Sequence, residues 1–201
     1  MTAFDFSRRR FLADSGAALV AGWAAANGPA LERALRYARR AVAAPIRPSF
    51  EFFTAVQGAD IEAVTDQIWP ADDTPGARDT GVVYFIDHAL ATDPVAGKMK
   101  PFFSSGIELL QARIAELFPE TPGARFSSLP AERQVSVLHA IEATPFFDAV
   151  RTATCLALFS NPSYGANPEG RNWAAIGFVP RFVWRPPFGA YDQDAHAGEP
   201  Q

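Results

Sequence analysis

Apolar residues recur every three or four positions through most of this chain, and prolines separate the stretches that show the pattern. Such spacing puts apolar side chains on one face of an α-helix, which turns once in about 3.6 residues. The clearest stretch is residues 49–69, which ends before Pro70 and has apolar positions at Phe52, Val56, Ile61, Val64 and Ile68. The repeated pattern predicts an all-α fold, an irregular bundle of about five helices.

The other predicted helices cover residues 79–90, 101–118, a stretch that begins near Pro130, and 146–159. Residues 82–86 could also form a buried strand, but Asp79 and Thr80 can cap a helix and the neighbouring stretches are helical. The apolar face of the helix after Pro130 is predicted to carry Val135, Leu138 and Ile141. Residues 146–159 are apolar on nearly every side, so this helix is expected at the centre of the bundle.

The helical pattern stops at Ser160, and the rest of the chain is rich in proline, glycine and aromatic residues. Turn-forming residues predict a loop over residues 161–170, and no regular helix is expected beyond it. We expect an extended carboxy-terminal arm over residues 160–201 that covers either the chain's own helices or a partner. Aromatic residues and arginine are the usual anchors of protein interfaces. The arm's candidates for partner binding are Tyr164, Asn167, Arg171, Trp173, Phe178, Arg181, Phe182, Trp184 and Arg185.

The first 40 residues are unusually basic. They hold seven arginines against three acidic residues, a net charge of +4, whereas the rest holds 11 basic against 19 acidic residues, a net charge of −8. The residues that match a twin-arginine export signal are Ser7, Arg8, Arg9, Phe11 and Leu12. The apolar run that follows, residues 13–26, is too short and too polar to favour a membrane span, which needs ~20 apolar residues.

This start predicts export by the twin-arginine translocase to the periplasm, with association with the inner membrane also open. Residues 1–43 are expected to form the signal and a basic linker or helix, and residues 44–201 a single helical domain. Small residues at 24–26 and at 41–43 are both candidate cleavage sites. The alternative is a basic amphipathic surface helix over residues 4–40.

Few residues suggest chemistry in this chain itself. Its single cysteine, Cys155, excludes an internal disulfide framework and cysteine-rich metal clusters, and its apolar neighbours predict a buried side chain. The sequence has no glycine-rich nucleotide-binding motif, so no cofactor is expected in this chain. A sequence pI of 5.4 argues against nucleic acid as a partner.

Two competing functions start from individual residues. An enzyme would use His88 as a base beside Asp87, with Asp72 and Asp73 in the same cleft, although adjacent helical residues do not face each other. A periplasmic protein that binds carbohydrate or an electron carrier would instead use the tryptophans of the arm.

Short motifs follow one another in a fixed order through most of the chain. Residues 68–77 read Ile-Trp-Pro-Ala-Asp-Asp-Thr-Pro-Gly-Ala, residues 82–87 Val-Val-Tyr-Phe-Ile-Asp, residues 126–129 Phe-Ser-Ser-Leu, and residues 146–151 Phe-Phe-Asp-Ala-Val-Arg. The ending Asn-Pro-Ser-Tyr-Gly-Ala-Asn at residues 161–167 is followed by Trp173 and by Ile-Gly-Phe at 176–178. Together these motifs resemble the gluconate 2-dehydrogenase subunit 3 family. Ala166 stands where the family's second glycine is usual, which argues against a positive φ there.

The resemblance implies a small, cofactor-free subunit of a periplasmic, FAD-dependent sugar or sugar-acid dehydrogenase complex. In such complexes a large flavoprotein of the glucose–methanol–choline oxidoreductase type carries the FAD and performs the oxidation. A cytochrome c subunit with haem c often takes the electrons onward. The small subunit binds the large subunit, supports its maturation and lends its export signal. By this implication the chain has no catalytic, cofactor-binding or metal-binding residues of its own.

Overall fold

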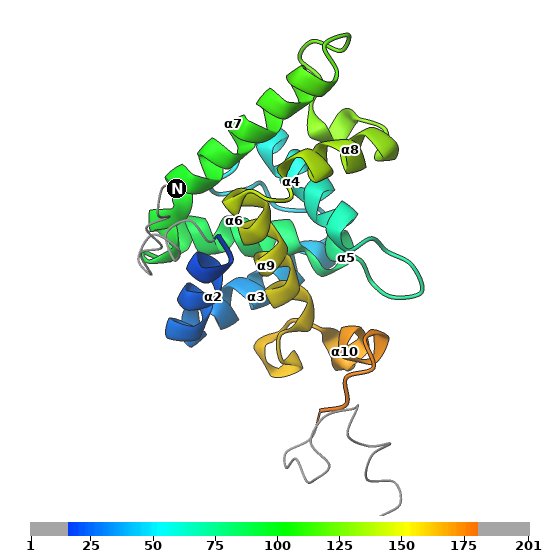
Figure 1. The fold of residues 1–201 in the computed structure, drawn as a ribbon. Helices are drawn as coiled ribbons and strands as arrows, with labels where there is room; N and C mark the ends of the chain where they lie inside the picture. Colours follow the sequence, from blue (N-terminus) through cyan, green and yellow to red (C-terminus); the bar gives the residue numbers. More distant parts are fainter. Residues whose placement is uncertain (1–15, 181–201) are drawn as a thin grey trace, which may run out of the picture.

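The structure is a computed structural model that describes residues 16–180, and this part of the chain contains α-helices and 3₁₀ turns but no strand (Figure 1). Its α-helices are α2 (Gly16–Ala26), α3 (Gly28–Ala43), α4 (Ala55–Ile68), α5 (Ala77–Thr80), α6 (Val82–Thr92), α7 (Lys100–Leu117), α8 (Ala131–Ile141), α9 (Pro145–Phe159) and α10 (Arg171–Ala175). The 3₁₀ turns are η1 (Ala96–Met99), η2 (Phe126–Ser128), η3 (Pro162–Tyr164) and η4 (Pro168–Gly170). The predicted all-α, irregular bundle is confirmed, and the strand considered for residues 82–86 is helix α6 instead.

Helix α9 runs through the middle of the bundle and contacts α2, α4, α5, α6, α7, α8 and α10 (Figure 1). Its buried apolar side chains are those of Phe146, Ala149, Val150, Ala153, Ala157 and Leu158. A sequence that is apolar on nearly every side suits this central position, because neighbours approach from several directions. The prediction for Cys155 is wrong: its side chain is exposed on α9.

Helix α4 begins at Ala55 rather than at residue 49. A capping box starts it: Gln57 N donates to Thr54 Oγ1 at 3.2 Å, and Thr54 N donates to Gln57 Oε1 at 3.0 Å. The segment before the cap is held by the buried carboxylate of Asp87, which accepts hydrogen bonds of 2.6, 2.9 and 2.8 Å from the backbone N–H groups of Glu51, Phe52 and Phe53. These bonds keep the segment irregular and attach it to α6.

A glycine divides the helix predicted over residues 79–90 into α5 and α6. Gly81 has a φ of 74°, in the left-handed region that residues other than glycine rarely adopt. A Cβ atom at this position would lie 2.7 Å from Val42 Cγ1 and 3.0 Å from the carbonyl oxygen of Ala38. The missing side chain therefore also permits the close packing of α3 against this turn.

Helices α2 and α3 share one hydrophobic core with the rest of the described chain. Val20 and Trp23 are buried where α2 packs against α9, and Leu31 and Leu35 are buried in α3, which packs against α6. The Trp23 side chain also donates from Nε1 to Asp93 Oδ1 at 2.9 Å. The domain boundary expected at residue 43 thus does not coincide with a boundary of the core.

The expected export motif over residues 7–12 lies outside the described residues, whereas α2 covers most of the apolar run that follows it. Within residues 16–180, none of the helices combines the length and the apolar character needed to cross a membrane.

Candidate partner-binding surface

The described part of the arm, residues 160–180, folds into η3, η4 and α10 at the end of the bundle near α3, away from α7 and α8 (Figure 1). The prediction that no regular helix follows the loop is wrong for residues 171–175. Turn chemistry starts the arm, because Asn161 Oδ1 accepts a hydrogen bond of 3.0 Å from Ser163 N.

Two side chains attach α10 to the end of α9. Asn172 Nδ2 donates to the carbonyl oxygen of Leu158 at 3.0 Å, and Trp173 Nε1 donates to that of Phe159 at 2.7 Å. The last turn of a helix leaves carbonyl oxygens without donors from the helix itself, so these bonds complete the end of α9. Trp173, a predicted partner-binding residue, is thus committed in part to its own chain.

The loop before α10 changes direction through left-handed backbone at Gly165, Asn167, Glu169 and Gly170. Ala166 has no positive φ, in agreement with the expectation from its side chain. Asn167 has a φ of 46° and is completely buried, and its Oδ1 accepts a hydrogen bond of 2.9 Å from Asn172 N. Asparagine suits this position because it tolerates the left-handed region better than most residues.

Apolar side chains of the arm also face outward. Their exposed fractions are 42% for Tyr164, 54% for Ile176, 41% for Phe178 and 59% for Val179. The Phe178 ring meets the Trp173 ring edge to face at a centroid distance of 5.3 Å, which fixes its position. Tyr164 and Phe178 were predicted from the sequence as partner-binding residues, whereas Ile176 and Val179 become candidates only through their exposure. Exposed apolar side chains at neighbouring positions, as at Ile176, Phe178 and Val179, are typical of binding surfaces.

The predicted candidates therefore have different roles. Tyr164 and Phe178 are exposed, Trp173 is half-buried, and Asn167 is buried. Arg171 is exposed and forms an ion pair of 2.9 Å with Glu169. Four further candidates lie outside the described residues: Arg181, Phe182, Trp184 and Arg185.

The residues considered for catalysis separate into two groups. In α6, Asp87 is occupied by the three backbone N–H groups of residues 51–53. His88 Nδ1 lies 3.2 Å from Glu51 Oε2, and its ring stacks on Tyr37 at a centroid distance of 4.0 Å. Burial, followed by the nearby Glu51 carboxylate, raises the pKa of Tyr37. This group holds α3, α6 and the segment between α3 and α4 together.

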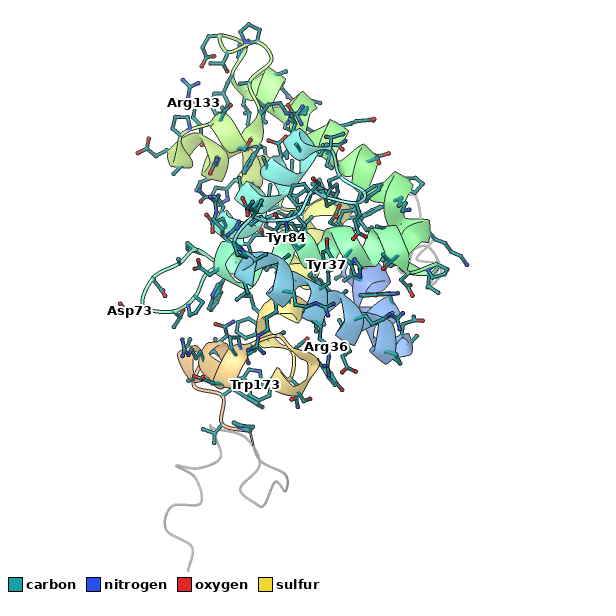
Figure 2. The ribbon with its side chains drawn as sticks, turned by 180° about the vertical axis from the view of Figure 1, so that it is seen from behind. Arg36, Tyr37, Asp73, Tyr84, Arg133 and Trp173 are labelled. Carbon is teal, nitrogen blue, oxygen red and sulfur yellow. The ribbon has the colours of Figure 1, made fainter. Side chains whose placement is uncertain are left out.

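The other group, Asp72 and Asp73, lies in the loop between α4 and α5, which projects from the bundle (Figure 2). Asp72 Oδ1 accepts hydrogen bonds from Thr74 N at 2.8 Å and from Thr74 Oγ1 at 2.9 Å, and these bonds lower the pKa of Asp72. Within residues 16–180, no hydrogen bond or ion pair joins the two groups. Over the same residues, no cluster of three or more His, Cys, Asp or Glu side chains could hold a metal ion.

Comparison with protein families gives a match over residues 55–180 to the model of gluconate 2-dehydrogenase subunit 3. The chain belongs to the gluconate 2-dehydrogenase subunit 3 family. The match begins at the first residue of α4 and extends through the described part of the arm. Helices α2 and α3 precede the matched region. Searches among curated proteins and among solved structures returned no match.

Proposed function

We propose that this chain is the non-catalytic small subunit of a FAD-dependent sugar or sugar-acid dehydrogenase complex. The family match carries the proposal, because it describes a subunit of a dehydrogenase. The FAD would lie in the large subunit, and haem c in a cytochrome c subunit. This chain would bind the large subunit and support its maturation.

The outward side of the arm is the surface best suited to this binding. Ile176, Phe178 and Val179 place large apolar groups in solvent, and Tyr164 adds a further exposed ring. Burying them in an interface would remove apolar area from water, at about 25 cal/mol per Å². Stable interfaces bury about 800 Å² on each partner, so the arm would need help from an adjoining surface.

Export to the periplasm is part of the proposal and rests on the sequence at residues 7–12. The twin-arginine route carries folded proteins, so the large subunit could cross with this chain after it has taken up FAD. A chain that holds no cofactor but carries such a signal is well suited to escort a partner. Association with the inner membrane would then come from the complex.

The proposal is tested with the full, affinity-tagged chain recovered from its native host. We expect a co-purifying protein of larger mass with the absorbance spectrum of bound flavin and with sugar dehydrogenase activity. Arg8→Lys combined with Arg9→Lys should leave both proteins in the cytoplasm. Recovery of the chain alone, or export of the flavoprotein without it, would contradict the proposal.

Changing the outward side of the arm tests the interface. Phe178→Ser combined with Val179→Ser should release the flavoprotein, since both side chains are exposed and the body of the bundle does not depend on them. Val135→Ser on α8 is the matched control, because Val135 is also 41% exposed but lies on another part of the bundle. If the control and the arm variant retain the flavoprotein equally, the arm is not the interface.

A further inference from the structure

A groove lies beside the arm, between α3, the loop that precedes α5, and residues 165–168. Its cavity volume is about 180 Å³, and one side is open to solvent. Its walls are mainly apolar and come from Leu35, Ala38, Val42, Pro75, Ala157 and Ala166, with Arg39, Asp79, Thr80 and Asn167 as polar members. This is smaller than the roughly 300–1,000 Å³ of sites for drug-sized ligands, so the groove suits a few side chains of a partner rather than a whole ligand.

One polar atom of the groove is buried without a partner. Asn167 is completely buried, and its Oδ1 is used by Asn172 N, but its Nδ2 has no hydrogen-bond partner among residues 16–180. A buried donor left unpaired destabilises the folded state, so such groups are rare in folded proteins. The free N–H bonds of this amide therefore suit an acceptor oxygen that the described chain does not provide.

The rim of the groove on the α3 side is basic. Arg36 lies against the arm, since a Cβ atom on Gly165 would come within 2.9 Å of Arg36 Cγ. Figure 2 shows Arg36 at the junction of α3 with the arm, on the same side as Trp173. Arg39 and Arg40 are exposed and form no ion pair with any residue of the described chain, although Arg36 pairs with Glu32. These guanidinium groups favour acidic side chains on whatever binds here.

We propose that the groove binds an extended, acidic segment of the large flavoprotein subunit. Asn167 Nδ2 donates to a main-chain carbonyl oxygen of that segment, its apolar side chains enter between Leu35 and Pro75, and its carboxylates meet Arg36 and Arg39. The inference rests on the proposed function and adds to it a second contact beside the exposed arm. A peptide suits the groove better than a free anion, because most of the lining is apolar.

The experiment uses the full tagged chain in its complex with the co-purified flavoprotein. A photo-cross-linking phenylalanine analogue replaces Pro75 in the groove or, as a control, Val135 on α8. Irradiation should join position 75, but not position 135, to one peptide of the flavoprotein, and that peptide should be rich in Asp and Glu. A cross-link from position 75 to residues 181–201 of this chain, or to a non-protein molecule, would overturn the inference.

Two variants test the chemistry of recognition. Asn167→Asp keeps an oxygen that can accept the hydrogen bond from Asn172 N, and aspartate also tolerates a positive φ. The substitution removes the unpaired Nδ2 donor. It should weaken the complex about tenfold, as expected for a lost hydrogen bond and an added repulsive charge. Arg39→Glu should weaken it by a similar factor of about ten, and the loss should shrink at high salt. Arg133→Glu is the control, because Arg133 lies at the opposite end of the bundle (Figure 2).

The outcomes separate this inference from the proposed function. If a flavoprotein co-purifies but neither variant weakens binding and position 75 gives no cross-link to it, the groove is not its site, although the proposed function stands. If no flavoprotein co-purifies with the unaltered chain, the proposed function fails and the inference fails with it.

Discussion

Helices α2 and α3 begin the described chain and the arm ends it, and the two regions differ in whether their buried polar groups have hydrogen-bond partners. In α2, the Trp23 N–H group is buried and bonded to Asp93, which also accepts hydrogen bonds from the backbone of Val95 and Ala96. In the arm, Asn167 and Asn172 are just as buried, yet Asn167 Nδ2 and Asn172 Oδ1 have no partner within residues 16–180.

The exposure of apolar side chains differs between the two regions in the same way. Helices α2 and α3 bury most of their large apolar side chains against α9 and α6, with Leu19 as an exposed exception, whereas the arm exposes Ile176, Phe178 and Val179. The contrast indicates that α2 and α3 stabilise the bundle, and it supports the proposal that a partner covers the arm. It is notable that α2 and α3 lie outside the region that matches the family, whereas the arm lies inside it.

Removing α2 and α3 should have the largest effect. Deletion of residues 1–43 would expose the faces of α6 and α9 that these helices cover, and we expect the remaining chain to lose its cooperative thermal unfolding. Circular dichroism and calorimetry of the purified chain measure the loss. Deletion of residues 1–15 is the control, because it leaves α2 and α3 in place.

The same comparison bears on processing of the export signal. Cleavage at residues 24–26 or 41–43 would remove buried side chains of α2 or of both helices. We therefore expect the chain, if exported as proposed, to retain Gly16 and all residues after it, as intact mass determination would show. A stable mature chain that begins after Ala43 would contradict both expectations.

Replacing a single tryptophan in each region should have a smaller effect on stability, and the loss should again be larger in α2 than in the arm. Trp23→Ala removes a buried ring that also packs 6.2 Å from Phe85, and it should cost about 3–5 kcal/mol of unfolding free energy. Trp173→Ala removes a half-buried ring and one hydrogen bond, so about 1–3 kcal/mol is expected. Chemical denaturation of the two variants gives both values. Equal losses would mean that the arm is as much a part of the core as α2.

Whether a feature could be predicted from the sequence depends on how far apart in the chain the interacting residues lie. Local signals placed α4, α6, α7, α8 and α9, because apolar spacing, prolines and caps act within one helix. The apolar face of α8 was partly misplaced: Val135 is 41% exposed, and Val137 is the buried residue. Which of two nearby apolar residues faces the core depends on the neighbouring helix, and the periodicity of the sequence does not specify that helix.

Long-range pairs were beyond sequence reasoning. Buried Asp60 accepts hydrogen bonds from Arg125 Nε at 2.9 Å and from Ser127 N at 3.0 Å, although these residues are more than 60 positions away in the chain. The groove beside the arm is similar, since α3, Pro75 and Asn167 come together only in the folded chain. Asn167 was selected from the sequence, but the basic rim at Arg36 and Arg39 was not. Its arginines had been assigned to the basic start of the chain.

The smallest predicted effect concerns acid stability. Burial would raise the pKa of Asp93, but the hydrogen bonds from Ala96 N, Trp23 Nε1 and Val95 N outweigh it and lower the pKa. A carboxyl group whose folded pKa lies below its unfolded value, about 3.9, contributes stability above that pH and loses it as the pH falls through the folded pKa. Trp23→Phe removes one of these donors and keeps most of the ring.

The unfolding free energy of Trp23→Phe should therefore fall less than that of the unaltered chain between pH 5 and the acid limit of about pH 2. Trp173→Phe is the matched control, because its donor bonds a carbonyl oxygen rather than a carboxylate. It should lower stability by the same amount at every pH. Other carboxyl groups with lowered pKa values, such as Asp72, are present in both variants and cancel in the comparison. Parallel pH profiles for the two variants would show that the Trp23–Asp93 bond does not favour the charged carboxylate.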